Sequence, residues 1–126
     1  MKIVGLGESR YNPILFDTWS IIHYLSGVIF AIWMIYLKVN FLYGFVLWFF
    51  IHALHEIKDL IWTKYNIYGW NVSVLNCLGD QFIAVIGFIT PYIFENVINY
   101  ARNLHILIFL LFIILVFDLV NKRQKK

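Results

Sequence analysis

Four apolar segments, each close to the length that crosses a lipid bilayer, occupy most of this 126-residue chain. A helix needs about 20 apolar residues to span the hydrocarbon core. The segments run over about 18–37, 41–62, 72–94 and 104–120. Only short connections lie between them. The pattern therefore predicts one membrane domain over 1–126, an all-α bundle of four transmembrane helices.

The composition favours lipid over water as the solvent. The chain is 62% hydrophobic and 13% charged, whereas a soluble domain carries about 25% charged residues. So few charges cannot coat a globule in water, and we expect a multi-pass integral membrane protein in contact with membrane lipids. Basic residues just beyond a membrane helix usually set its topology and contact anionic lipid headgroups. We interpret the basic residues of this chain in that way and expect no nucleic-acid partner.

Lys and Arg in short loops indicate the cytoplasmic side of a membrane protein. With four spans, the N-terminus, the second loop and the C-terminus share one side. That side holds Lys2, Arg10, Lys64, Lys122, Arg123, Lys125 and Lys126. The other side holds only Lys38 and Arg102. We therefore place both termini in the cytoplasm or its topological equivalent.

Polar residues interrupt the first three apolar segments. Ionisable groups inside a span cost roughly 2.5–3.5 kcal/mol each, which makes them candidates for function. They are spaced three and four residues apart, so each helix presents one polar face. The set comprises His23, Ser26, His52, His55, Glu56, Asp59, Asn76, Asp80 and Gln81, with Asp17 as the expected N-cap of the first helix.

The depth of these residues indicates a shared site. With a rise of about 1.5 Å per residue, most of them fall in one layer, in the cytoplasmic half of the membrane. We expect His23, Glu56 and Asp80 to lie close enough to interact directly or through one water. Their charge is unbalanced, because no Lys or Arg is expected on the same faces and Lys58 is expected to point elsewhere. Carboxylates cannot stay charged side by side in low dielectric, so some are protonated, the histidines are cationic, or a cation is bound.

Three interpretations of the cluster stay open. In an enzyme, Glu56 or Asp80 would be the acid or base and His23 or His55 its partner. For a divalent metal, the candidate ligands are His52, His55 and Glu56, although their order differs from the His-Glu-x-x-His zinc motif. In a structural network, the polar groups would bond across helices to fix the bundle. The cation could also be the amine of a lipid headgroup. In the first case the remaining polar residues, Asp17, Ser26, His52, Asp59, Asn76 and Gln81, would bind or position the ligand.

The same residues carry a family resemblance. Phe16-Asp17 precedes His23, and Glu56-Ile57-x-Asp59, Asn76-x-x-x-Asp80 and Gly87-Phe88 follow. This pattern, over roughly 16–88, resembles the VanZ-like group of small membrane proteins, and more closely a related bacterial branch of unknown function. The chain departs from that branch at three positions, His55 for Trp, Asp59 for Glu and Cys77 for Ser. The resemblance implies a link to the cell envelope or its lipids, without implying a reaction.

The function expected from these features is binding or modification of a lipid or envelope precursor at the inner leaflet. Whether the protein is an enzyme stays open. The alternative is a non-catalytic structural or assembly subunit of a membrane complex or viral envelope, working as a homo-oligomer or with another membrane protein.

The charge bias predicts the side of the membrane on which Asn71 lies. Asn71-Val72-Ser73 matches the N-glycosylation sequon, and our topology places it in the cytoplasm. Expression in a eukaryotic host should therefore leave Asn71 unmodified, and cysteine-accessibility labelling should report both termini as cytoplasmic. Efficient glycosylation of Asn71 would reverse the orientation.

Overall fold

The computed structural model describes residues 2–5, 14–94 and 104–124. Its long helices are α1 (Thr18–Tyr36), α2 (Phe41–Lys64), α3 (Val74–Ile93) and α5 (Leu104–Gln124). A short 3₁₀ turn, η1 (Ile67–Gly69), links α2 to α3, and two short strands, β1 (Lys2–Val4) and β2 (Ile14–Phe16), precede α1. The predicted segments agree with the four helices to within about one turn at each end.

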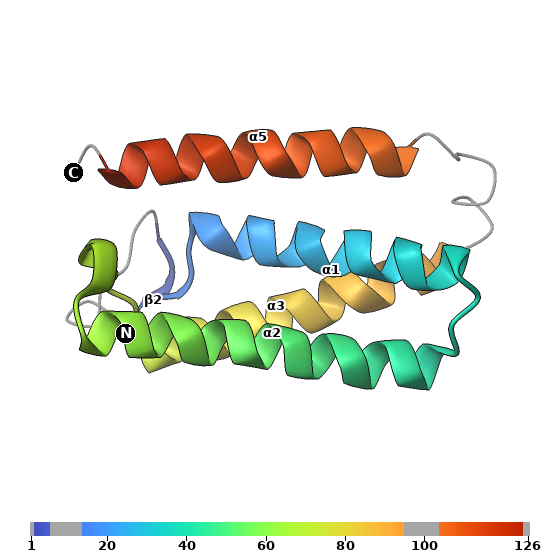
Figure 1. The fold of residues 1–126 in the computed structure, drawn as a ribbon, viewed down its shortest axis with the longest axis horizontal. Helices are drawn as coiled ribbons and strands as arrows, with labels where there is room; N and C mark the ends of the chain where they lie inside the picture. The colour runs from blue at the N-terminus through green and yellow to red at the C-terminus, as the bar shows by residue number, and fades with distance from the viewer. Residues whose placement is uncertain (1, 6–13, 95–103, 125–126) are drawn as a thin grey trace.

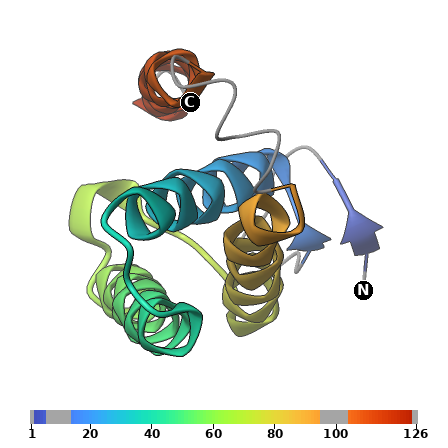
Figure 2. The same ribbon diagram turned by 90° about the vertical axis from the view of Figure 1, so that its right-hand side faces the viewer.

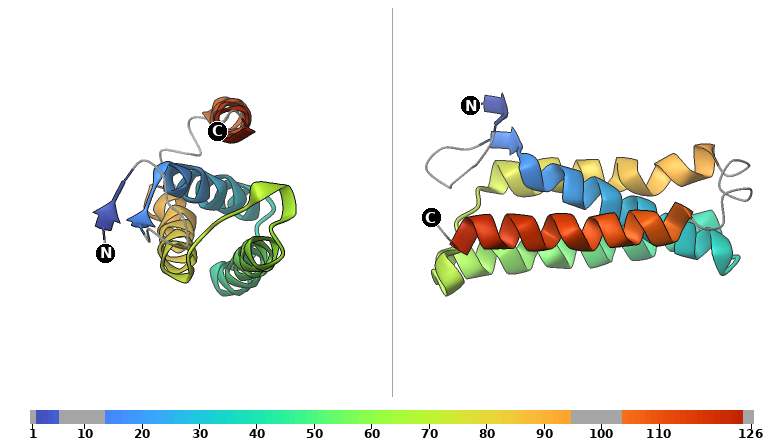
Figure 3. Two further views of the ribbon diagram at one scale, coloured as in Figure 1. Left: turned by 90° about the vertical axis from the view of Figure 1, so that its left-hand side faces the viewer. Right: turned by 90° about the horizontal axis from the view of Figure 1, so that it is seen from above.

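Helices α1, α2 and α3 pack as a three-helix group, and α5 lies along the outside of this group (Figures 1 and 2). The strands, η1 and the C-terminal end of α5 all lie at one end of the molecule, which we call the η1 end (Figures 1 and 3). The turn between α1 and α2 lies at the opposite end. This up-and-down course is the one expected for a chain that crosses a layer several times.

Side-chain caps define where the first helices begin. Asp17 is the N-cap of α1, as predicted, and its Oδ1 accepts a hydrogen bond of 2.9 Å from the Trp19 backbone N–H. The Ser20 hydroxyl accepts in return from the Asp17 N–H at 3.1 Å, which completes a capping box. The side-chain oxygens of Asn40 and Ser73 cap α2 and α3 by accepting from the Leu42 and Asn76 backbone N–H groups. These caps satisfy backbone donors that neither lipid nor a packed interior could satisfy.

A glycine contact sets the spacing of α1 and α3. A Cβ added at Gly27 would lie 2.8 Å from the Phe88 backbone nitrogen and would also meet the Ala84 carbonyl. A Cβ at Gly87 would lie 2.9 Å from the carbonyl carbon of Tyr24. The two backbones therefore touch here, as in the small-residue contacts of membrane helices.

Helix α2 is polar inside and apolar outside. His52 and Glu56 on its inner face are 3% and 6% exposed, whereas Phe50 and Leu54 on its outer face are 62% and 65% exposed. A protein in water would show the reverse distribution. By length and apolarity, two helices of the described part, α1 and α3, qualify as candidates to cross a membrane.

The interior divides into two parts along the helix axes. Toward the α1–α2 turn it is apolar and aromatic, with Ala31, Trp48, Ala84 and Phe88 buried together. Toward the η1 end it is polar. Trp48 marks the boundary, because its indole N–H donates to the Ala84 carbonyl at 3.0 Å.

The small parallel sheet was not expected from the sequence. β1 pairs with β2, with Lys2 opposite Ile14. The Asn76 side-chain amide on α3 donates to the Ile14 carbonyl at 3.2 Å and the Leu15 carbonyl at 3.4 Å. Leu15 also lies directly against Gly79, leaving no room for a Cβ there. Asn76, predicted as a ligand-binding residue, therefore anchors β2 to α3.

The glycine contact predicts the effect of adding one methyl group. Replacing Gly by Ala inside a helix normally stabilises it by roughly 0.5–1 kcal/mol. We expect Gly27→Ala and Gly87→Ala to destabilise the protein by about 1–3 kcal/mol instead, because backbone atoms cannot move aside. The matched control is Gly44→Ala, whose Cβ would meet only the Met34 and Phe88 side chains at 3.2 Å. Thermal unfolding in detergent measures the difference, and equal midpoints for all three variants would contradict the contact.

Candidate functional site

The predicted convergence of His23, Glu56 and Asp80 is confirmed. His23 Nε2 lies 3.3 Å from Asp80 Oδ2, and His23 Nδ1 lies 3.5 Å from Glu56 Oε1. All three side chains are buried. They come from α1, α2 and α3, so the polar site joins the three helices of the central group.

His23, His52 and Glu56 form a triangle of acceptor atoms, which we call the His/Glu triangle. His23 Nδ1 and His52 Nε2 are 2.7 Å apart, and Glu56 Oε1 is 3.5 Å from each. All three residues are buried, and these atoms are close enough to serve as ligands of one metal ion. Glu56 Oε1 has no hydrogen-bond partner, which is costly for a buried carboxylate oxygen.

The outer nitrogen of His52 is held by Gln81. His52 Nδ1 lies 2.8 Å from Gln81 Oε1, and Gln81 Nε2 donates to the Phe49 carbonyl at 3.2 Å. The Phe49 carbonyl fixes the orientation of the amide, because a rotated amide would set two oxygens against each other. Gln81 Oε1 is then the acceptor and His52 Nδ1 carries the hydrogen. The Nε2 atom, which faces the triangle, is left with a lone pair.

The outer nitrogen of His23 is held by Asp80. His23 Nε2 lies 3.3 Å from Asp80 Oδ2, and an ionised carboxylate can only accept, so a neutral His23 is best served with its hydrogen on Nε2. The other carboxylate oxygen accepts from the Ser20 hydroxyl at 2.7 Å. The same hydroxyl accepts from the Asp17 backbone N–H, so the helix cap supports the carboxylate. His23 Nδ1 is therefore also left with a lone pair facing the triangle.

Asp59, Lys58 and His55 form a separate group on α2. Lys58 Nζ lies 2.7 Å from Asp59 Oδ1, and His55 Nε2 lies 3.6 Å from Asp59 Oδ2. The expectation that Lys58 points away from the carboxylates is wrong. Its long flexible stem lets the ammonium group reach the carboxylate of the next residue. Asp59 is the carboxylate of the cluster that a lysine neutralises.

His55 was predicted as a metal ligand beside His52 and Glu56, and the structure replaces it with His23. The His55 side chain is 45% exposed and turns toward Asp59. His52 and Glu56 are four residues apart and share the inner face of α2, whereas His55 lies further round the helix. A sequence pattern on one helix could not show that the third ligand-type side chain comes from α1.

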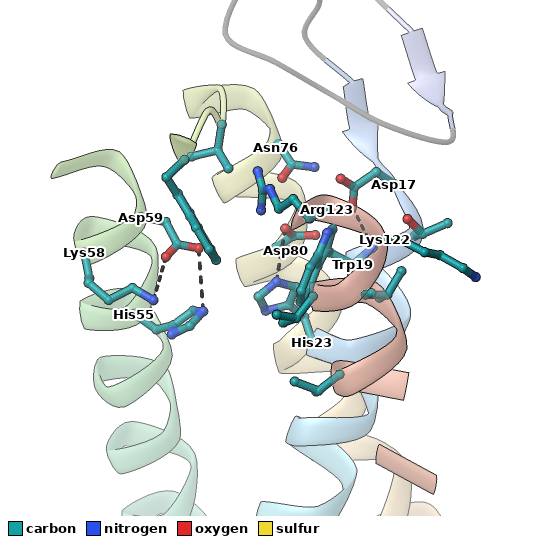
Figure 4. A pocket seen from close by; sticks show the side chains of 16 residues that line it. Asp17, Trp19, His23, His55, Lys58, Asp59, Asn76, Asp80, Lys122 and Arg123 are labelled. Carbon is teal, nitrogen blue, oxygen red and sulfur yellow. Dashed lines mark hydrogen bonds and ion pairs between the residues drawn. The ribbon is translucent and has the colours of Figure 1, made fainter. Parts of the chain in front are cut away.

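A pocket of about 700 Å³ opens beside this site at the η1 end. Figure 4 shows side chains from α1, α2, α3 and α5 pointing into it. Its charged and polar lining residues are Asp17, Thr18, His23, His55, Lys58, Asp59, Asn76, Asp80, Lys122 and Arg123. Trp19 and Trp70 and an apolar wall of Val72, Val116, Leu119 and Val120 complete the lining. The expectation that the carboxylates have no basic neighbour is therefore wrong for α5 as well as for Lys58.

Arg123 reaches the pocket from the far end of the chain. Its guanidinium group lies 4.3 Å from the ring centre of Trp70 and 5.8 Å from that of Trp19, a cation–π arrangement. Asp17 stands nearby, and burial raises the pKa of its carboxyl group, while the Trp19 and Ser20 backbone N–H groups and the Arg123 charge act in the opposite direction.

The remaining predicted site residues make contacts other than the predicted ones. The Ser26 hydroxyl donates to the His23 carbonyl in its own helix at 2.7 Å, and Ser26 does not line the pocket. Gln81 positions His52 as described. Sequence reasoning missed Ser20, although it shares a helix face with His23 at a spacing of three. It also missed Trp19, Trp70 and Arg123 as pocket residues, because only the tertiary packing brings them together.

Comparison of the chain with protein-family models, curated proteins and solved structures found no match. The resemblance to the VanZ-like group stays a prediction that rests on the motifs themselves. Within them, Glu56 and Asp80 contact the same histidine, and Asp59 stands apart with Lys58.

The two α2 histidines should differ in their importance for stability. His52→Leu would leave Gln81 Oε1 and His23 without their buried partner, so we expect a loss of about 1–3 kcal/mol. His55→Leu changes a half-exposed side chain, so we expect a change within about 0.5 kcal/mol. Thermal unfolding of the two variants in the same detergent measures the contrast. Equal losses would show that the His23–His52–Gln81 contacts do not hold the bundle.

Proposed function

We propose that this protein is a multi-pass membrane protein that binds a phospholipid headgroup carrying both phosphate and amine, in the pocket at its cytoplasmic end. The observation that carries the proposal is the pocket lining. Basic side chains of α2 and α5 line the pocket together with carboxylates from the first three helices, and apolar residues of α5 line it beside them. A phospholipid with a zwitterionic headgroup matches this lining, because its headgroup carries both charges and its acyl chains are apolar.

The membrane part of the proposal rests on the inside-out distribution of side chains. Large apolar residues are exposed along α2 and α5, while histidines and carboxylates are buried between α1, α2 and α3. In a bilayer the outer face would meet acyl chains, and the buried polar groups would be shielded from them. We propose that all four helices cross the bilayer, with the η1 end in the cytoplasm. The basic residues Lys58, Lys64, Lys122 and Arg123 lie toward this end, in agreement with the positive-inside rule.

Each part of the headgroup has a counterpart in the pocket. A planar guanidinium group binds phosphate oxygens in pairs, so Arg123 is the expected phosphate ligand. Asp17 and Asp80 are carboxylates that could accept from an ammonium group. Trp19 and Trp70 suit the level of the headgroups. Val116, Leu119 and Val120 face the same space and would contact the first carbons of the chains.

If the bound lipid is also modified, the pocket favours one acid–base pair. Of the predicted catalytic residues, His23, His55 and Asp80 line the pocket, whereas Glu56 is not among the lining residues. His23 and Asp80 are in contact at 3.3 Å, so a proton could pass between them beside a bound headgroup. Glu56 lies behind His23, and we assign it no direct contact with the lipid.

Lipid binding is tested by exchanging the pocket charges. Arg123→Gln should weaken binding of phosphatidylethanolamine about tenfold, the loss expected for one charge-assisted hydrogen bond. Native mass spectrometry of the purified protein, with a census of co-purifying lipids, measures the effect. The matched control is Lys64→Gln, because Lys64 lies at the same end, on α2, and does not line the pocket.

The outcomes separate the two functions considered. Selective retention of an amine-bearing phospholipid, lost in Arg123→Gln and kept in Lys64→Gln, supports the pocket. Retention that is equal for both variants would contradict it. A stable complex with another membrane protein and no retained lipid would favour a structural or assembly subunit instead.

A further inference from the structure

We propose that the His/Glu triangle is a binding site for one divalent transition-metal ion, with His23 Nδ1, His52 Nε2 and Glu56 Oε1 as ligands and zinc as the best fit. The outer nitrogens of His23 and His52 face a carboxylate oxygen of Asp80 and the amide oxygen of Gln81, which are acceptors. Neutral rings with their hydrogens on those outer nitrogens present lone pairs on both inner nitrogens. Glu56 Oε1 is a third acceptor at the same point.

Three acceptors facing one another need something positive between them. The two nitrogens are only 2.7 Å apart, and two lone pairs at that distance repel unless a proton or a cation lies between them. A single proton can join the two nitrogens, but it leaves Glu56 Oε1 unsatisfied at 3.5 Å from each. A metal ion satisfies all three atoms at once.

The size of the triangle fits a tetrahedral ion. With metal–ligand distances of about 2.0–2.1 Å, the ligand atoms of tetrahedral zinc lie roughly 3.3 Å apart. The three edges here are 2.7, 3.5 and 3.5 Å. Only the distance between the two histidine nitrogens has to increase. Because the two rings belong to different helices, small rotations of the side chains can increase it. Two imidazoles and one carboxylate form a common ligand set of zinc sites that keep a fourth position open.

The residues behind the ligands strengthen the assignment. Metal-binding histidines almost always donate their other N–H to a carboxylate or a carbonyl oxygen, which orients the ring. His23 has a carboxylate in this position and His52 has an amide oxygen. Each is supported in turn, Asp80 by the Ser20 hydroxyl and Gln81 by the Phe49 carbonyl. A structural network has no need to turn two lone pairs and a carboxylate oxygen toward one point.

His23 also connects the triangle to the pocket, whose lining it shares. The open fourth position of the ion could therefore be reached from that side. The metal site does not depend on lipid binding, since His52 and Glu56 are not among the pocket-lining residues and the three ligands are complete without a headgroup.

The test measures zinc on purified protein in detergent. After chelator treatment, loading with zinc chloride and desalting, the wild-type chain should hold about one zinc ion. Glu56→Gln and His52→Ala should each lose most of it, and Gln81→Ala should bind about 10–100-fold more weakly because its histidine is no longer oriented. His55→Ala is the matched control, a histidine on the same helix outside the triangle, and should bind as the wild type does. Elemental analysis gives the stoichiometry, and the visible absorption of bound cobalt reports the ligand set.

Folding is monitored in the same samples. Zinc should raise the unfolding midpoint of the wild type and of His55→Ala, since a ligand that binds only the folded state stabilises it. Glu56→Gln keeps the side-chain volume, so the proposal stays testable if His52→Ala does not fold. A wild-type chain that holds no zinc, or variants of the triangle that hold as much as His55→Ala, would overturn the site. If the purified wild-type protein binds zinc but retains no lipid, the metal site is supported and only the proposed lipid binding is contradicted.

Discussion

A chain of close polar contacts through the interior organises this protein. It begins at the N-cap of α1, where Ser20 bonds to Asp80, and continues through His23 and His52 to Gln81. Each link joins two different helices, so the chain holds α1, α2 and α3 in one register. Polar groups buried away from water are costly when they lack partners. That cost makes the arrangement specific, because any other register would leave a histidine or a carboxylate unpaired among apolar side chains.

The rest of the interior is arranged around this constraint. Aromatic packing of Phe30, Trp48 and Phe88 fills the half of the bundle that carries no charge. The small residues Gly27, Ala84 and Gly87 let α1 and α3 approach until their backbones touch. This close approach brings Ser20 and His23 within reach of Asp80, about four helical turns from the end of α1 at Tyr36. The polar site is therefore a product of the packing as much as of the polar residues themselves.

Much of the fold was predictable from the sequence, and part of the site was. Length and hydropathy locate the four helices, and the spacing of His52 and Glu56 places both on one face of α2. The choice of His23 over His55 beside them could not be predicted, because it depends on the rotation of α1 about its axis. Asp17 and Ser20 form a local cap that sequence can suggest, whereas Arg123 meets Trp70 only through the fold. The β1–β2 pair escaped prediction because strands of three residues carry too little periodicity to be distinguished from a loop.

The glycine contact also limits how the molecule can move. Because α1 and α3 touch along their backbones, and the Tyr24 hydroxyl adds a hydrogen bond to Thr90 at 3.1 Å, neither helix can slide or rotate without a clash. These two helices therefore form the rigid part of the molecule. Any motion that widens the pocket beside His23 would then come from displacement of α2 or α5, because no glycine of α2 or α5 in the described part of the chain touches a neighbouring backbone in this way. His52 and Glu56 belong to α2 and would move with it, while His23 belongs to α1 and would stay in place. Displacement of α2 would therefore pull the polar cluster apart and its return would reassemble it, whereas displacement of α5 would leave the cluster intact.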